Sequence, residues 1–252
     1  MTDLIRALNS ELFKLRRTLA LRLAIVIPVV MVLLQFSVAL SRGAEFMARV
    51  DNPVVWFGNQ TIFMWSFLML PLFVCLETTL ISGVDHSGNN WKHLFALPVS
   101  RAALYTAKQL SCLGVVALGQ VVLVVLLIFA ELLLGWFNPD MGIAWPIPWV
   151  YFLGRAALAF SGALLIIAFH TWLSMKWPSF AVSVGVGIAM TVVGLIVMNS
   201  GWSAYYPWTI PAELLRRSEE AGVTLRLIGW SAGGGMLVYL LGMLEIRRRE
   251  IF

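Results

Sequence analysis

Six runs of apolar residues, separated by short polar stretches, follow one another along the chain. Each run is long enough to cross a hydrocarbon core of about 30 Å, which takes roughly 20 helical residues. Lipid offers no partner to backbone N–H and C=O groups, and the apolar/polar alternation of a strand is absent, so each run is predicted to be a helix. The pattern therefore predicts an all-α, polytopic membrane protein with six transmembrane helices, at about residues 19–41, 60–82, 104–136, 149–173, 180–200 and 227–246.

The segment TDLIRALNSELFKLRR, residues 2–17, is amphipathic instead of uniformly apolar. At the helical repeat its leucines fall on one face and its charged residues lie elsewhere around the helix. We expect an N-terminal helix that lies in the inner membrane interface. The leucines on its apolar face are Leu4, Leu8, Leu12 and Leu15.

Composition agrees with the hydrophobic pattern and favours a single domain. The chain is 60% hydrophobic and 12% charged, with a mean hydropathy of +0.86, which lies outside the range of soluble domains. No shift in composition and no polar linker marks a second domain. We therefore expect residues 1–252 to form one transmembrane domain.

Positive charges are distributed unevenly between the two sides of this topology. Twelve Lys and Arg residues fall on the side of the two termini and six on the opposite side. Loops rich in Lys and Arg stay on the cytoplasmic side, so both termini are predicted to be cytoplasmic. The net charge of +5 is explained by topology and indicates no nucleic-acid partner. The first apolar run is too long for the core of a cleaved signal peptide, so we expect it to remain as a span.

Motifs for nucleotide and metal binding are missing from the sequence. No Gly-Lys pair occurs, so the chain cannot form a P-loop around nucleotide phosphates. Cys75 and Cys112 lie in or next to spans, away from any CxxC or His-rich cluster, and are expected to be small buried hydrophobic residues. We expect no catalytic residue, no metal site and no bound cofactor. If ATP drives the protein, another chain binds it.

The stretch GWSAG, from Gly229 to Gly233, matches the serine motif of hydrolases and approaches that of six-span intramembrane proteases. A hydrolase would need a strand before Ser231, and none is predicted. An intramembrane protease would need a histidine at the depth of Ser231, which lies at the outer end of the sixth span. The histidines lie instead toward the inner side, on the order of 20 Å away. A Ser231 protease is thus the weaker alternative; the histidines are His86, His93 and His170.

Small residues at four-residue spacing give the motif a simpler explanation, because they let membrane helices approach closely. On this interpretation Gly229 and Gly233 pack the sixth span, and the same spacing on the fifth span assigns helix packing to Ala181, Gly185 and Ala189.

Two carboxylates fall inside predicted spans, where an unpaired charge is costly. Glu131 lies about one turn from the outer end of the third span, and we expect it to reach toward the interface. Glu77 lies deeper in the second span. Two roles stay open for Glu77: a helix-packing partner, or a hinge group required for function.

The stretch NNWKHLFALPVSRAALYTAK, residues 89–108, is a polar interruption between the second and third spans. It predicts a short helix ended by Pro98 that presents Trp91 and Phe95 beside Lys92 and His93. Aromatic and cationic residues spaced in this way suit contact with another protein. The alternative is an interfacial helix with Trp91 among the lipid headgroups.

At these residues the chain also resembles a known family. ETTLISG, WKHLFALPVSRAALYTAK, YYPWTIP and RRREIF, together with the six-span layout, resemble permease subunits of type-2 ATP-binding-cassette (ABC) exporters. The resemblance is greatest to lantibiotic-immunity and bacitracin-resistance permeases. It implies a dimer of identical or paired permeases in the bacterial cytoplasmic membrane, bound to two cytoplasmic ATPases that carry the ATP and Mg²⁺.

The resemblance also implies a mechanism. Residues 88–97 would be the coupling helix that docks in the ATPase, with the helix of residues 2–17 beside it, and ATP-driven closure would release an amphiphile outward. Such a substrate would be an antimicrobial peptide, a lipid-like molecule or a drug. A membrane sensor or assembly subunit that transports nothing is the other alternative. The coupling residues implied are Asn90, Trp91, Lys92, His93, Phe95, Pro98 and Arg101.

Overall fold

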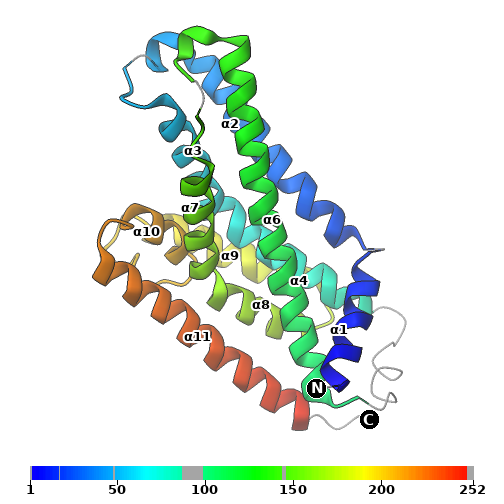
Figure 1. The fold of residues 1–252 in the computed structure, drawn as a ribbon. Helices are drawn as coiled ribbons and strands as arrows, with labels where there is room; N and C mark the ends of the chain where they lie inside the picture. Colours follow the sequence, from blue (N-terminus) through cyan, green and yellow to red (C-terminus); the bar gives the residue numbers. More distant parts are fainter. Residues whose placement is uncertain (1, 17, 48, 87–98, 144–145, 249–252) are drawn as a thin grey trace.

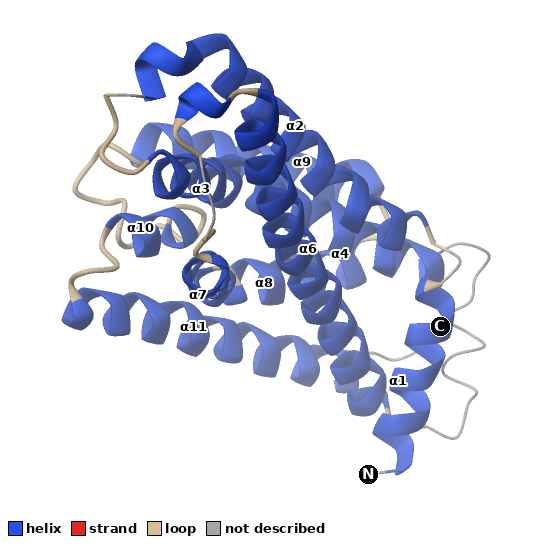
Figure 2. Ribbon diagram, turned by 45° about the horizontal axis from the view of Figure 1, so that its top comes forward, coloured by secondary structure: helices blue, strands red, loops and turns tan. Residues whose placement is uncertain are grey.

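The structure, a computed structural model, describes residues 2–16, 18–47, 49–86, 99–143 and 146–248, and these residues are helical with short connections (Figures 1 and 2). No strand occurs among them, which confirms the predicted all-α class. The α-helices are α1 (Thr2–Leu15), α2 (Leu19–Met47), α3 (Pro53–Met64), α4 (Leu70–His86), α6 (Arg101–Phe137), α7 (Trp149–Gly162), α8 (Leu164–Lys176), α9 (Phe180–Val197), α10 (Ile210–Arg216) and α11 (Ala221–Arg248). A π-helical turn, η1 (Trp65–Met69), joins α3 to α4, and a 3-10 turn, η3 (Pro139–Met141), follows α6.

Five helical stretches in the described residues are long and apolar enough to cross a membrane, and α7 with α8 makes a sixth if the bent pair is one span. The protein is therefore a multi-pass membrane protein, as the six apolar runs predicted. The second predicted span corresponds to the continuous stretch of α3, η1 and α4, from Pro53 to His86. The third corresponds to α6, whose 37 residues measure about 55 Å at 1.5 Å per residue.

Helix ends coincide with residues that favour them. Asn52 caps α3 by accepting a hydrogen bond from the Val55 N–H at 3.1 Å, and Pro53 follows at the first helical position. Ser100 caps α6 by accepting from the Ala103 N–H at 3.3 Å. Such side chains satisfy backbone donors that a helix start leaves open. Near its end α2 breaks at Gly43, whose φ of 74° suits a residue without a Cβ.

The core forms where α6 crosses the other helices, in the middle of the bundle (Figure 1). Large aromatic rings fill it by packing on glycines. A Cβ at Gly119 of α6 would come within 2.7 Å of the Phe73 ring of α4, and one at Gly58 of α3 would overlap the Phe152 ring of α7. Phe73 and Phe152 are fully buried, so these glycines set the distances between the helices that they join.

The fourth predicted span, 149–173, is broken instead of continuous. α7 and α8 meet at an angle of 48° between Gly162 and Leu164. Ser231 of α11 forms hydrogen bonds to backbone groups on both sides of the break. Its Oγ donates to the Gly162 carbonyl at 2.8 Å and accepts from the Leu165 N–H at 3.3 Å. A serine hydroxyl that satisfies backbone groups at a break is a known way to keep a bent helix in a membrane.

α9 and α11 each pack closely on neighbouring helices through small residues, but these residues are not the predicted ones. A Cβ at Gly187 would overlap Cys75 of α4, one at Gly235 would come within 3.1 Å of the Leu164 backbone, and one at Gly242 within 2.9 Å of Trp172. The five predicted positions are instead exposed on the outside of the chain: Ala181, Gly185, Ala189, Gly229 and Gly233.

A Cβ at Gly185, Gly229 or Gly233 would meet nothing within 4 Å. The prediction was therefore wrong for contacts within this chain. A four-residue spacing shows that residues share one face of a helix. It does not show which face packs, because a second set of residues two positions away has the same spacing.

The corrected register leads to a matched pair of substitutions in one helix. Gly187→Ala is expected to lower the free energy of unfolding by about 1–3 kcal/mol, because the new methyl group overpacks the contact with Cys75. Gly185→Ala, two residues away on the open side, is expected to be neutral or stabilising by up to about 1 kcal/mol. Thermal unfolding of the two purified variants in detergent compares them. Equal effects would contradict the register.

Candidate functional site

The predicted coupling residues lie at the connection between α4 and α6. Asn90, Trp91, Lys92, His93, Phe95 and Pro98 fall outside the described residues, so their helix stays a prediction. The helix ends on either side of this connection, which we call its roots, are described by the structure. α4 ends at His86, and α6 begins at Arg101, behind the Ser100 cap. The candidate site therefore consists of these two helix ends and of the side chains that contact them.

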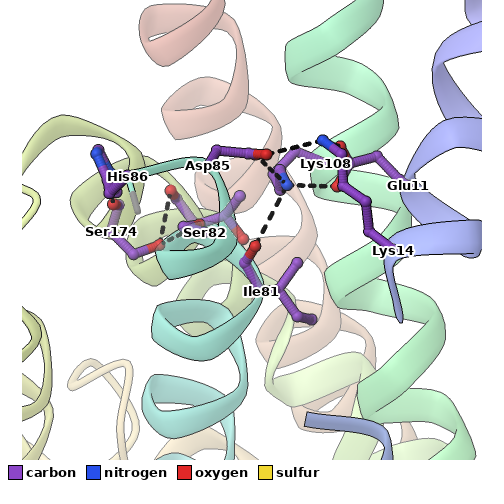
Figure 3. Close-up of polar contacts among 9 residues, drawn as sticks. Glu11, Lys14, Ile81, Ser82, Asp85, His86, Lys108 and Ser174 are labelled. Carbon is purple, nitrogen blue, oxygen red and sulfur yellow. Dashed lines mark hydrogen bonds and ion pairs between the residues drawn. The ribbon is translucent and has the colours of Figure 1, made fainter. Parts of the chain in front are cut away.

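A buried cluster of four charged side chains joins the roots to α1 (Figure 3). Lys14 of α1 lies 2.7 Å from Glu11 of the same helix and 2.7 Å from Asp85 of α4. Lys108 of α6 pairs with both carboxylates, Glu11 and Asp85, and its Nζ also donates to the Ile81 carbonyl at 3.3 Å. We call Glu11, Lys14, Asp85 and Lys108 the ion cluster.

The ion cluster is electrically balanced and largely withdrawn from solvent. Two cations face two anions, and Glu11, Asp85 and Lys108 are at most 4% exposed. Removing one partner from such a site leaves an uncompensated buried charge, which costs about 3–5 kcal/mol. The three helices are thus held together by interactions that are difficult to break one at a time.

The end of α4 is also bonded to α8. The Ser82 hydroxyl lies 2.9 Å from the Ser174 hydroxyl, and His86 Nε2 donates to the Ser174 carbonyl at 2.9 Å. Figure 3 shows these contacts on one side of α4 and the ion cluster on the other. The last turn of α4 therefore connects α1, α6 and α8 at the point where the predicted coupling segment begins.

α1 is a helix as predicted, and the predicted stripe of leucines is divided between its packed side and its exposed side. It packs through Ala7, Glu11 and Leu15, which are buried, whereas Leu12 is 48% exposed and Ile5 is 54% exposed. Glu11 lies in the contact between α1 and α6 because its carboxylate pairs with Lys108. The exposed Ile5 and Leu12 leave α1 with an apolar side that can contact lipid.

Sequence reasoning missed the ion cluster, although it counted Lys14 and Lys108 as topology signals. One signal was present: Asp85 and Lys108 are charged residues close to the ends of consecutive apolar runs, where a charge without a partner is costly. Pairing them would also have required α1, from which no spacing rule predicts a contact.

Glu77 lies two turns farther into α4 than Asp85, on the same side of that helix. It is fully buried, and neither carboxylate oxygen has a hydrogen-bond partner within the described part of the chain. Glu131 of α6 is also fully buried without a recorded partner, so the expectation that it reaches the interface was wrong. The hinge role of Glu77 stays a prediction.

Glu77→Gln keeps the shape of the side chain and removes its ability to ionise. If Glu77 is a hinge group of the exporter that the resemblance implies, ATP hydrolysis by the permease–ATPase complex is expected to lose its stimulation by substrate, while expression persists. Glu131 is a second buried carboxylate, on α6. Glu131→Gln is therefore the matched control and is expected to keep the stimulation. Unchanged coupled activity in Glu77→Gln would make Glu77 a packing residue.

The contacts of Ser231 bear on the protease alternative. Its recorded hydrogen bonds, within the residues described, go to backbone atoms of Gly162 and Leu165. His86 is bonded to Ser174, and His170 packs edge-on against the Trp208 ring at 5.8 Å. Ser231 therefore has a structural role that accounts for its burial. The described residues contain no group of three or more His, Cys, Asp or Glu side chains that could hold a metal ion.

Comparison with known protein families adds to this geometry. The model of the family described as ABC-2 family transporter protein matches residues 7–194 of the 252. The match includes all four residues of the ion cluster and the segment between α4 and α6. A search of curated proteins finds no match. Because the family model covers most of the sequence, the chain belongs to the ABC-2 family of transporter proteins.

Proposed function

We propose that this chain is the membrane-spanning permease subunit of an ATP-driven exporter that moves an amphiphile outward. Membership of the ABC-2 family supports a permease that works with separate ATPase subunits. The proposal adds three finer points. The permease is a dimer, the coupling segment is residues 88–97, and the substrate is of the kind handled by lantibiotic-immunity and bacitracin-resistance permeases.

The observation that carries the proposal is the position of the ion cluster. Residues 87–100 lie between α4 and α6 in the sequence, and the cluster joins the nearby turns of these helices to each other and to α1. A force applied to the segment by an ATPase would act on both helices at once. Because separating the buried charges is costly, α1, α4 and α6 would move as one unit.

Movement of this unit would reach the middle of the membrane. α4 continues inward through Glu77 and the fully buried Phe73, which packs on Gly119 of α6. The Ser82 and His86 contacts pass the same displacement to Ser174 of α8. ATP binding and hydrolysis on the partner subunits would thus tilt the spans and change the path open to the substrate.

Orientation and location are also part of the proposal. α1 and the last turn of α11 lie at the same end of the bundle (Figure 1), where Tyr105, Met175 and Ile246 pack together. This arrangement supports an even number of crossings with both termini on one side. The excess of Lys and Arg on that side supports a cytoplasmic position for the termini in a bacterial cytoplasmic membrane.

The test is purification of the tagged chain from its native membrane, followed by reconstitution in liposomes. An ATP-hydrolysing subunit is expected to elute with the chain in constant ratio. In liposomes, ATP is expected to drive a fluorescent amphiphile across the bilayer, and a non-hydrolysable analogue is not. Purification without a nucleotide-hydrolysing partner would contradict the proposal. ATP hydrolysis without movement of the amphiphile would favour a sensor.

A further inference from the structure

A cavity of about 330 Å³ lies between α6, α8 and α11 and is lined by residues outside the ion cluster. Its volume falls within the range of about 300–1,000 Å³ that ligand pockets occupy. Leu110 and Met236 stand at its rim and are 42% and 57% exposed. In a membrane protein these exposed apolar side chains face lipid, so the cavity is accessible from the bilayer.

The cavity wall changes from polar to apolar along the helices. At the end nearer the start of α6, the Thr106 hydroxyl lies 2.7 Å from the Tyr239 hydroxyl. Gln109, one turn farther along α6, is 6% exposed, and its Oε1 has no hydrogen-bond partner among the described residues. Farther from that end the wall is formed by Leu113, Leu164 and Ala232.

This gradient fits an amphiphile whose polar part lies toward the start of α6 and the end of α11. A buried carbonyl oxygen without a partner, such as Gln109 Oε1, is costly, and the Gln109 side chain also carries an N–H donor. The ester groups of a glycerophospholipid can accept a hydrogen bond from the Gln109 Nε2–H, and a hydroxyl of a glycerol headgroup can donate to Oε1. The apolar part of the wall is suited to a hydrocarbon chain.

The charge near the polar end favours an anionic headgroup. Arg247 follows Met236 by about three turns of α11 and so lies on the same side of that helix. Arg247 and Arg248 are exposed and have no ion pair recorded in the described part of the chain, whereas Glu245, the nearby carboxylate, is paired with Lys176 at 2.9 Å. Basic residues at the end of an intramembrane groove attract anionic headgroups.

We infer that the cavity between α6, α8 and α11 binds one acyl chain of an anionic phospholipid. The chain lies along Leu113, Leu164 and Ala232, the ester groups reach Gln109, and the phosphate lies toward Arg247.

The experiment uses the full chain in liposomes with a trace of phospholipid that carries a photoreactive acyl chain. One probe has a phosphatidylglycerol headgroup and the other a phosphatidylcholine headgroup. After irradiation, labelled peptides are mapped by mass spectrometry. Labels are expected on α6, α8 and α11 at the cavity wall, with the anionic probe favoured, and Arg247→Gln is expected to remove the preference for the anionic probe.

Ala232→Phe fills the cavity and is expected to reduce labelling at its wall by about tenfold, which corresponds to about 1.4 kcal/mol. Met236→Trp, at the exposed rim, obstructs the entrance without changing the core and is expected to act in the same direction. Ala189→Phe, on the exposed side of α9, is the control and should leave labelling unchanged. Equal labelling of the parent and both blocking variants, or labels spread over all lipid-facing helices, would overturn the inference.

Discussion

Lys108→Met is expected to lower the free energy of unfolding by about 3–5 kcal/mol, because it leaves Glu11 and Asp85 with one cation between them in a buried site. The methionine keeps most of the length of the lysine, so the loss reports the charge more than a cavity. A change of this size is a large part of the ordinary stability of about 5–15 kcal/mol. Denaturant unfolding in detergent measures it, and the amount of monodisperse protein provides a second readout.

Two variants make the experiment on Lys108 specific. Lys176→Met removes the cation of the pair with Glu245, in which both side chains are about one-third exposed, and is expected to cost less than about 1 kcal/mol. Lys108→Met combined with Glu11→Gln leaves Lys14 with Asp85 and restores the charge balance, so it is expected to recover part of the stability. If Lys108→Met and Lys176→Met behave alike, the ion cluster does not hold the three helices together.

The spans could be predicted from the sequence because their signal is local. An apolar run long enough to cross lipid has one main solution, a helix. α2 and α6 follow the predicted runs closely, and α11, from Ala221 to Arg248, contains the predicted run 227–246. The break between α7 and α8 could not be predicted, because no proline marks it and the group that satisfies it, Ser231, comes from α11. Periodicity likewise found the small residues of α9 and assigned the wrong stripe to packing within the chain.

The ion cluster could not be predicted for a related reason. Lys14 and Asp85 are 71 positions apart, and Glu11 and Lys108 are 97 positions apart. No local pattern reports such pairings. The sequence predicts a shared coupling role for Trp91 and Phe95, because aromatic residues beside cations stand out in a polar interruption between spans, and this role stays a prediction.

The largest functional effect is expected from Trp91→Ala combined with Phe95→Ala. If both rings insert into a groove of the ATPase, each truncation removes a buried anchor worth about 2 kcal/mol or more. Association then weakens at least tenfold, at about 1.4 kcal/mol per decade. Lys92→Ala, at the rim in this arrangement, is the comparison variant and is expected to change mainly the association rate and its dependence on salt. If the segment is an interfacial anchor instead, the double variant inserts poorly and whatever inserts keeps its ATPase.

The ratio of ATPase to permease after affinity purification and gel filtration tests the central claim most directly. It is measured on membrane-inserted protein for the parent, for Lys92→Ala, and for Trp91→Ala with Phe95→Ala. The account predicts that the parent and Lys92→Ala retain the ATPase at moderate salt, whereas the double variant inserts normally and retains about a tenth of it or less. If the double variant retains the ATPase as fully as the parent does, the segment between α4 and α6 is not where the ATPase drives this permease.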